Sequence, residues 1–146
     1  TVDEYEVMKL HPVDGEAMLA SEPALEAAAR IVRSHHERFD GAGYPDGLEG
    51  RDIPLASRII AVCDALDAMT HDRQYRRAMP LNMAFAILRE HAGSQWDERV
   101  VEQVMATVPT MPIENAFDQV GRDDDLERTP IPDDIGELLL TVDAEI

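Results

Sequence analysis

Two adjacent histidines, His35 and His36, follow a predicted helix and precede a glycine-rich segment, which makes them the first candidates for chemistry. Neutral imidazole is the commonest protein ligand for a metal ion. Neighbouring positions on an α-helix point about 100° apart, so the pair suits two ions, or one ion and one substrate, better than a single shared ion. Adjacent histidines are also common on protein surfaces, so the pair alone is a weak signal for a metal site.

A second candidate is Asp64, which lies inside the most apolar predicted helix, in Ile-Ile-Ala-Val-Cys-Asp-Ala-Leu-Asp-Ala-Met. A buried carboxylate is costly unless it is paired or coordinates a metal. Asp67, three residues further on, shares a helix face with Asp64. The alanines around them equally permit a solvent-exposed face with two ordinary surface acids, and the helix alone does not decide between these readings.

His11 and a cluster of arginines can each be interpreted as functional or as structural residues. His11 precedes Pro12 at an expected helix break, where a hydrogen-bonded structural histidine is the ordinary outcome. Arg73, Arg76 and Arg77 cluster after the Asp64 helix, and guanidinium groups suit phosphate oxygens and guanine edges. Cations at a helix C-terminus also favour the helix dipole, and without further context this second reading is preferred.

The elements that must position these residues are predicted to be helices, because apolar side chains recur at helical spacing. We predict helices over residues 3–20, 21–34 and 81–91, one that Pro54 opens and one that Asp97 caps, with Pro12 and Gly15 breaking the first near His11. The expected buried stripe of the Pro54 helix is Leu55, Ile59, Val62, Cys63, Leu66 and Met69. Residues 39–53 are predicted to form a structured loop. No segment alternates long enough for a strand, so the predicted fold class is all-α.

Composition limits the class of protein. The 146 residues have a mass of 16.3 kDa, are 45% hydrophobic and carry a net charge of −17. This is one domain's worth of chain, and its acidity disfavours nucleic acid and anionic lipid as partners. No apolar run approaches the length of a membrane span, and no signal peptide is evident. The single cysteine, Cys63, fits a reducing compartment, so the expected location is the cytoplasm.

Charge also divides the chain into two predicted parts. Residues 1–112 hold 19 acidic and 11 basic side chains, whereas residues 113–146 hold 11 acidic and 2 basic ones, with Pro130, Pro132 and the acidic run 123–125. We therefore predict a globular body over 1–112 and an acidic, loosely ordered tail over 113–146. One apolar stretch of the tail, residues 135–142, is a candidate for docking on the body or on a partner.

Taken together, several motifs resemble the HD-GYP domain. The resemblance runs from about residue 3 to 106 and rests on His-His-Glu at 35–37, Asp-Gly-Ala-Gly-Tyr-Pro at 40–45, Ile-Pro-Leu at 53–55, the stretches 58–64, 67–70 and 72–76, and Ala-Gly-Ser-Gln-Trp-Asp at 92–97. It implies an all-helical bundle of the HD superfamily. It also implies a metal-dependent phosphodiesterase that hydrolyses cyclic di-GMP to pGpG or GMP at a bi- or trinuclear iron, manganese or magnesium centre.

The resemblance assigns roles by position. The residues that match metal ligands are His11, His35, His36 and Asp64. Arg73 and Arg76 match the basic pair that holds substrate phosphate and guanine, and Gly43, Tyr44 and Pro45 form the signature loop beside the site. Asp67 matches an acid that faces the lysine of the HD motif in the family.

The sequence departs from the family in one respect. The family's His-Asp pair and the following lysine precede the segment that resembles residues 3–20, and this sequence does not contain them. We therefore expect the chain to be the C-terminal portion of such a domain and to be inactive by itself. The alternative is a degenerate, non-catalytic HD-GYP module that senses nucleotide or binds diguanylate cyclase or response-regulator domains. A different HD-superfamily nucleotidase is disfavoured by the Gly-Tyr-Pro loop.

Overall fold

A computed structural model of the chain describes residues 6–72 and 76–110. Within these residues the regular elements are helices, and pairing between extended segments is limited to isolated bridges. In chain order they are α2 (His11–Ala20), η1 (Pro23–Leu25), α3 (Glu26–Arg33), η2 (Gly50–Asp52), α4 (Leu55–Thr70), α5 (Leu81–Glu90), α6 (Glu98–Thr107) and η3 (Val108–Thr110). The predicted all-α fold is confirmed. The predicted tail, residues 113–146, lies outside the described residues.

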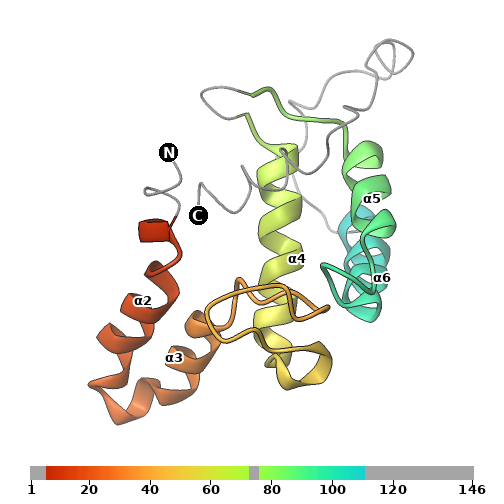
Figure 1. The fold of residues 1–146 in the computed structure, drawn as a ribbon. Coiled ribbons are helices and arrows are strands. Elements are labelled where there is room, and N and C mark those ends of the chain that lie inside the picture. Colours follow the sequence, from red (N-terminus) through yellow and green to blue (C-terminus); the bar gives the residue numbers. More distant parts are fainter. Residues whose placement is uncertain (1–5, 73–75, 111–146) are drawn as a thin grey trace.

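The helices form two groups, and Figure 1 shows α2 and α3 to the left of α4 and α5 and α6 to its right. α2 and α3 pack against each other as a hairpin, while α4, α5 and α6 pack together. A hydrogen bond of 3.0 Å from the Ser57 hydroxyl of α4 to the Ile31 carbonyl of α3 joins the two groups. Gly15 allows the hairpin to close, because a Cβ there would lie 2.7 Å from Cγ1 of Val32. Gly15 therefore packs within α2. The predicted break near His11 is confirmed, because residues 9–10 form a turn and α2 begins at His11 with Pro12 in its first turn.

The hydrophobic core lies among α4, α5 and α6. Its buried members are Val62, Ala65, Leu66, Ala68, Met69, Ala84, Ile87, Leu88, Trp96, Val100 and Val101. As predicted, Asp97 caps α6, and its side chain accepts a hydrogen bond of 2.9 Å from the Arg99 amide. The same carboxylate forms an ion pair with Arg58 of α4, whose Nε also donates to the Ile53 carbonyl at 3.0 Å. Both side chains of the pair are mostly buried.

The prediction for the buried face of α4 is wrong in part. Val62, Leu66 and Met69 are buried, but Leu55 is 56% exposed, Ile59 is 42% exposed, and Cys63 is an exposed free thiol. The reason is that α5 and α6 cover only one side of α4. The apolar stripe of α4 is wider than this contact, so the residues at its edge are exposed to solvent. Periodicity identifies an apolar face but not what covers it.

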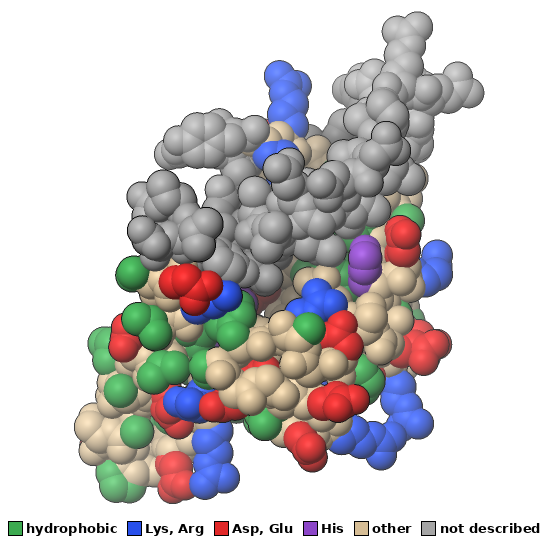
Figure 2. Space-filling view, viewed as in Figure 1, with side chains coloured by type: hydrophobic (Ala, Val, Ile, Leu, Met, Phe, Trp, Pro, Cys, Tyr) green, Lys and Arg blue, Asp and Glu red, His purple; other side chains and the backbone are tan. Residues whose placement is uncertain are grey.

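The described surface mixes both signs of charge. Figure 2 shows acidic and basic side chains interspersed on one face, with hydrophobic side chains gathered toward α2. Large apolar side chains exposed in that region include Val7, Leu10 and Met18. Among the described residues, no helix combines the length and the apolar character that crossing a membrane requires.

Candidate metal centre

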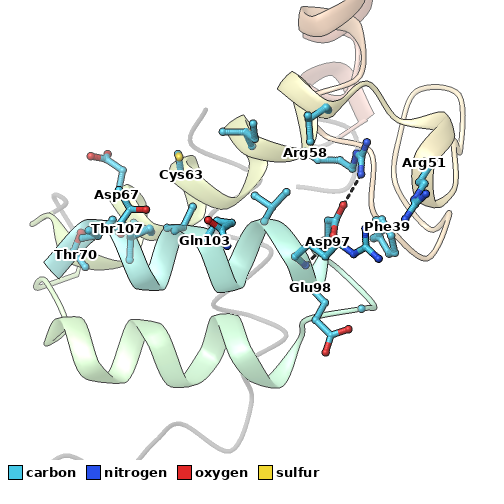
Figure 3. A pocket seen from close by; sticks show the side chains of 18 of the residues that line it. Phe39, Arg51, Arg58, Cys63, Asp67, Thr70, Asp97, Glu98, Gln103 and Thr107 are labelled. Carbon is cyan, nitrogen blue, oxygen red and sulfur yellow. Dashed lines mark hydrogen bonds and ion pairs between the residues drawn. The ribbon is translucent and has the colours of Figure 1, made fainter. Parts of the chain in front are cut away.

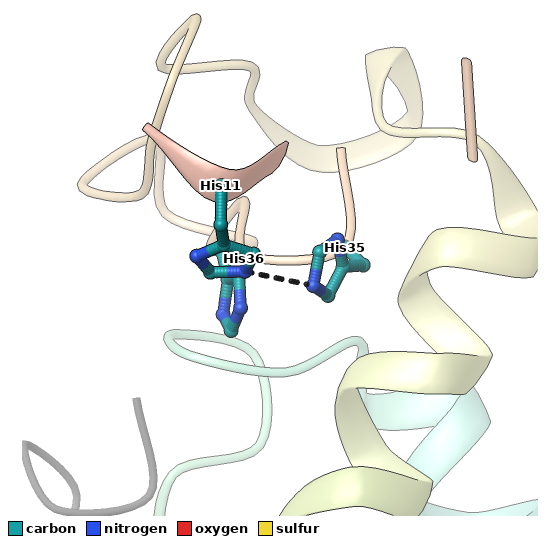
Figure 4. Close-up of side chains that lie close together, drawn as sticks. All are labelled: His11, His35 and His36. Atoms are coloured by element: carbon teal, nitrogen blue, oxygen red, sulfur yellow. Dashed lines mark hydrogen bonds between the residues drawn. The ribbon is translucent and has the colours of Figure 1, made fainter. Parts of the chain in front are cut away.

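The structure brings three of the predicted ligands, His11, His35 and His36, to one point. His11 is the first residue of α2, and the other two follow the end of α3 at Arg33. One ligand atom from each imidazole lies within 4.8 Å of the other two, and the three rings face one another in Figure 4. Because α3 ends before His35, the angle between neighbouring helical positions does not apply, and the rings of His35 and His36 lie 4.0 Å apart between centroids. The pair is therefore able to share one ion.

Hydrogen bonds to the backbone orient two of the imidazoles. Nδ1 of His11 lies 2.6 Å from the Met8 carbonyl, and Nδ1 of His35 contacts the Val32 carbonyl. A carbonyl only accepts, so each Nδ1 carries the proton and each Nε2 presents a lone pair. The two Nε2 atoms are 3.4 Å apart. Two lone pairs at this distance repel unless a cation lies between them, so the donor set fits a metal ion.

The electrostatic environment keeps His35 neutral. The pKa of His35 is lowered from 6.5 to about 4, chiefly by burial and also by the neighbouring His36 and His11, against the raising effect of its hydrogen bond to the Val32 carbonyl. The imidazole is therefore unprotonated near neutral pH. Only the neutral form ligates a metal ion, so no proton has to be displaced from His35 when an ion binds.

Asp64 lies beside this group without being one of its mutually close members. The side chain is half-buried, and partial burial raises the pKa of its carboxyl, an effect that His36 opposes and Asp67 reinforces. The interaction with His36 places the carboxylate within electrostatic reach of the histidines. Asp67 is more exposed, and a carboxylate oxygen of its side chain lies 3.0 Å from Nδ1 of His71, one turn further along.

The predicted signature loop forms a wall against His36. The Tyr44 ring stacks on the His36 imidazole, with centroids 5.0 Å apart and planes 14° apart, and the Tyr44 amide donates to the His36 carbonyl at 3.3 Å. The buried Glu37 anchors the loop, because its carboxylate accepts hydrogen bonds from the backbone amides of Asp46 at 2.7 Å and Leu48 at 3.0 Å. The orientation of His36 is thereby tied to the conformation of the loop.

Gly43 lets the loop approach this closely. A Cβ at Gly43 would lie 2.2 Å from the Arg38 amide nitrogen and 2.6 Å from Cα of Glu37. We expect Gly43→Ala to lower the free energy of unfolding by about 2 kcal/mol, because rigid backbone atoms must move. Gly50→Ala is the control, since Gly50 has a positive φ but open space around its Cβ position, and it should cost about 1 kcal/mol. Denaturant unfolding of both variants measures the difference, and an equal loss would contradict the close approach.

The predicted substrate-binding arginines are placed only in part. Arg73 lies outside the described residues. Arg76 is half-buried, and its guanidinium donates to the Ala68 carbonyl in the last turn of α4. This contact is the helix-terminal role that the sequence also allowed, and a guanidinium has five N–H donors, so it does not use the whole group.

One cavity formed by the described residues is separate from the histidines. It is a groove of about 940 Å³ between α4 and α6, and the three imidazoles do not line it. Figure 3 shows Cys63 and Asp67 on one side and Gln103 and Thr107 on the other, with Arg58 and Asp97 at one end. The exposed apolar residues of α4 described above line this groove.

A comparison with protein families decides the fold family. A family model described as "HD domain" matches residues 1–100. The chain belongs to the HD-domain family. The match spans both helix groups and all three histidines, and it agrees with the helical architecture.

Curated proteins similar to this HD domain confirm the HD-GYP resemblance. A cyclic di-GMP phosphodiesterase of Thermotoga maritima is 41% identical over 104 residues, which cover 70% of this chain and 28% of that protein. The cyclic di-GMP phosphodiesterase response regulator RpfG of Xanthomonas campestris is 42% identical over 107 residues, 72% of this chain and 28% of that protein. A 3'3'-cGAMP-specific phosphodiesterase of Vibrio cholerae is 33% identical over 111 residues, 76% of this chain and 24% of that protein. The matched part of the chain thus spans about a quarter of the length of these relatives.

Sequence reasoning assigned no role to several residues that shape the HD-domain site. From the sequence, Glu37 was identified only as part of a motif. Its position, directly after the histidine pair and before a glycine-rich loop, is one from which a carboxylate can accept hydrogen bonds from the loop backbone. Arg33, at the end of α3, contacts both Asp46 of the loop and Glu16 of α2. No local pattern reveals such a contact, because its partners lie 13 and 17 residues away.

Proposed function

We propose that the three histidines and Asp64 hold divalent metal ions and that the site hydrolyses a phosphodiester bond of cyclic di-GMP, giving pGpG or GMP. One observation carries the proposal: imidazole lone pairs converge on one point in an HD domain. Relatives of this domain are named as phosphodiesterases of cyclic dinucleotides. Iron, manganese and magnesium are the candidate ions, in a bi- or trinuclear centre.

The residues of the proposed site have different roles. His11 and His35 are oriented by backbone carbonyls, and His36 is held by the ring of Tyr44. Bound divalent ions would offset the charge of the phosphate and lower the pKa of water. The loop that contains Gly43, Tyr44 and Pro45 would shape one side of the substrate mouth. Asp67 would act on the ligand Asp64 without contacting the metal, because the negative charge of Asp67 raises the pKa of the Asp64 carboxyl.

Substrate recognition is assigned to Arg73 and Arg76. Both follow α4, the helix that carries Asp64, in the sequence. Arginine suits this role because its planar donor group matches phosphate oxygens and the guanine edge. The contact of Arg76 with the Ala68 carbonyl would orient the guanidinium.

Two substitutions in the whole gene product test this division. Arg76→Ala should retain manganese and weaken cyclic di-GMP binding about ten- to hundredfold, because one charge-assisted contact of roughly 1.5–3 kcal/mol is lost. Asp64→Ala should lower metal content and hydrolysis together, because an anionic neighbour of the histidines is removed. Metal analysis by mass spectrometry and calorimetric titration with cyclic di-GMP provide the readouts.

Each outcome bears on the proposal. Full metal content and full rate in Asp64→Ala would mean that this residue is a surface acid and would remove it from the site. Unchanged nucleotide affinity in Arg76→Ala would restrict that residue to its helix-terminal contact. Tight cyclic di-GMP binding without hydrolysis would overturn the catalytic assignment in favour of a sensing module that acts through diguanylate cyclase or response-regulator domains.

The proposal also covers the organisation of the chain and its setting. We assign the catalytic fold to residues 1–112 and treat residues 113–146 as an acidic tail outside it, since the family match ends at residue 100. A cytoplasmic location suits the exposed free thiol of Cys63, because reducing compartments preserve thiols.

A further inference from the structure

Arg33 forms a three-way contact at the base of the histidine group. It is the last residue of α3 and stands two residues before His35. Its Nε and Nη2 donate to the two carboxylate oxygens of Asp46 at 2.6 and 2.7 Å, and its Nη1 donates to Glu16 at 2.6 Å. Asp46 belongs to the loop and Glu16 to α2, so one guanidinium joins three elements.

Each of these three elements carries a part of the proposed metal centre. α2 begins with His11, α3 leads directly into His35, and the loop contains the tyrosine ring that stacks on His36. A planar guanidinium with three nitrogens engaged has little freedom to rotate, so it fixes both the separation and the relative orientation of its partners. A lysine would contribute charge at the same place but not this fixed fork.

The same contact contributes little to folding through charge alone. The side chains of Arg33, Glu16 and Asp46 are 29%, 30% and 36% exposed, and ion pairs of this exposure are screened by water. Arg30, one turn earlier on α3, supplies a natural comparison, because it pairs only with Glu26 on its own helix, with both side chains about two-thirds exposed. The difference between the two arginines is therefore geometric: one contact spans three elements and the other spans one helical turn.

We propose that Arg33 is a positioning residue for the metal centre, which sets the distance between His11 and the His35–His36 pair by clamping α2 and the loop onto the end of α3. The inference rests on the proposed metal site. It assigns no direct contact with metal or substrate to Arg33. Its effect should appear in how well the imidazoles converge, and only weakly in overall stability.

The test is a titration of the full chain with Mn²⁺ in four variants and the wild type. Arg33→Gln should raise the dissociation constant for Mn²⁺ about tenfold, as is typical when a residue that orients metal ligands is lost. Asp46→Asn should give a smaller increase, because Arg33 keeps its contact with Glu16. The Arg33→Gln/Asp46→Asn double variant should match Arg33→Gln, because both substitutions break the Arg33–Asp46 contact and the losses are not additive. Arg30→Gln should leave the constant unchanged.

A second readout separates positioning from general destabilisation. The visible absorption bands of bound Co²⁺ report coordination geometry, and they should change in Arg33→Gln, change less in Arg33→Lys, and stay unchanged in Arg30→Gln. If Arg33→Gln fails to fold, as judged by circular dichroism, Arg33→Lys and Asp46→Asn carry the comparison. Wild-type Mn²⁺ affinity and Co²⁺ spectrum in Arg33→Gln would overturn the positioning role. Absence of metal binding in the wild type would instead count against the proposed function.

Discussion

Replacing His35 with alanine is expected to raise the dissociation constant of the chain for Mn²⁺ about a hundredfold or more. His35 contributes a neutral imidazole whose Nε2 lone pair lies 3.4 Å from that of His11, so its loss removes one donor from a group of three. At about 1.4 kcal/mol per tenfold change, a hundredfold loss corresponds to about 2.7 kcal/mol of binding free energy. Isothermal titration calorimetry of metal-free protein measures the effect directly.

The control for this experiment is His71→Ala. His71 is exposed and pairs with Asp67, and it lies outside the histidine group. Its removal should leave the high-affinity Mn²⁺ event intact while reducing any weak, non-specific binding. Equal Mn²⁺ affinity in wild type and His35→Ala would show that the convergence of the imidazoles holds no metal ion.

The second large effect concerns stability. Asp97→Ala is expected to lower the free energy of unfolding by about 3 kcal/mol. Loss of the α6 cap accounts for about 1 kcal/mol of this, because the Arg99 amide loses its acceptor. The remainder comes from Arg58, whose side chain is only 14% exposed and would keep a charge without its carboxylate partner. The expected loss of stability is smaller than the largest costs of breaking a buried ion pair, because Arg58 keeps the Ile53 carbonyl as a hydrogen-bond acceptor.

Two variants separate these contributions by denaturant unfolding. Asp97→Asn keeps a side-chain acceptor for the cap but loses the negative charge, so it should fall between wild type and Asp97→Ala. Arg99→Ala removes an exposed side chain from the same turn and should change stability by less than about 0.5 kcal/mol. A cost for Asp97→Ala no larger than that of Arg99→Ala would contradict the account of a buried pair at the junction of α4 and α6.

The sequence predicted the helices well where each had a local signal. Asp97 was predicted to cap α6 and does so, and the helix predicted over 81–91 is α5, Leu81–Glu90. It overestimated burial along α4, because the exposed Leu55 and Ile59 have the same spacing as the buried Val62. Which side of an apolar stripe is covered depends on the directions of neighbouring helices, and no local pattern contains those directions.

The candidate site was predicted through resemblance more than through local chemistry. Alone, His11 favoured a structural role, and the structure accommodates both interpretations: one ring nitrogen bonds the Met8 carbonyl while the other joins the histidine group. The clamp formed by Arg33, Glu16 and Asp46 had no sequence signal at all. Such contacts depend on the meeting of three elements, which only the folded chain defines.

The separation of the molecule into a helical hairpin and a helical core has a kinetic consequence. The three histidines lie within residues 11–36, whereas the buried cluster is drawn from residues 62–101. Regions with their own packing open with their own free energies, so undocking of α2 from α3 requires less than global unfolding. An ion held by the proposed site would be released each time the hairpin opens, and its affinity would scale with the docked fraction. Its residence time on the protein would therefore depend on the opening of a short hairpin, while the core among α4, α5 and α6 stays closed.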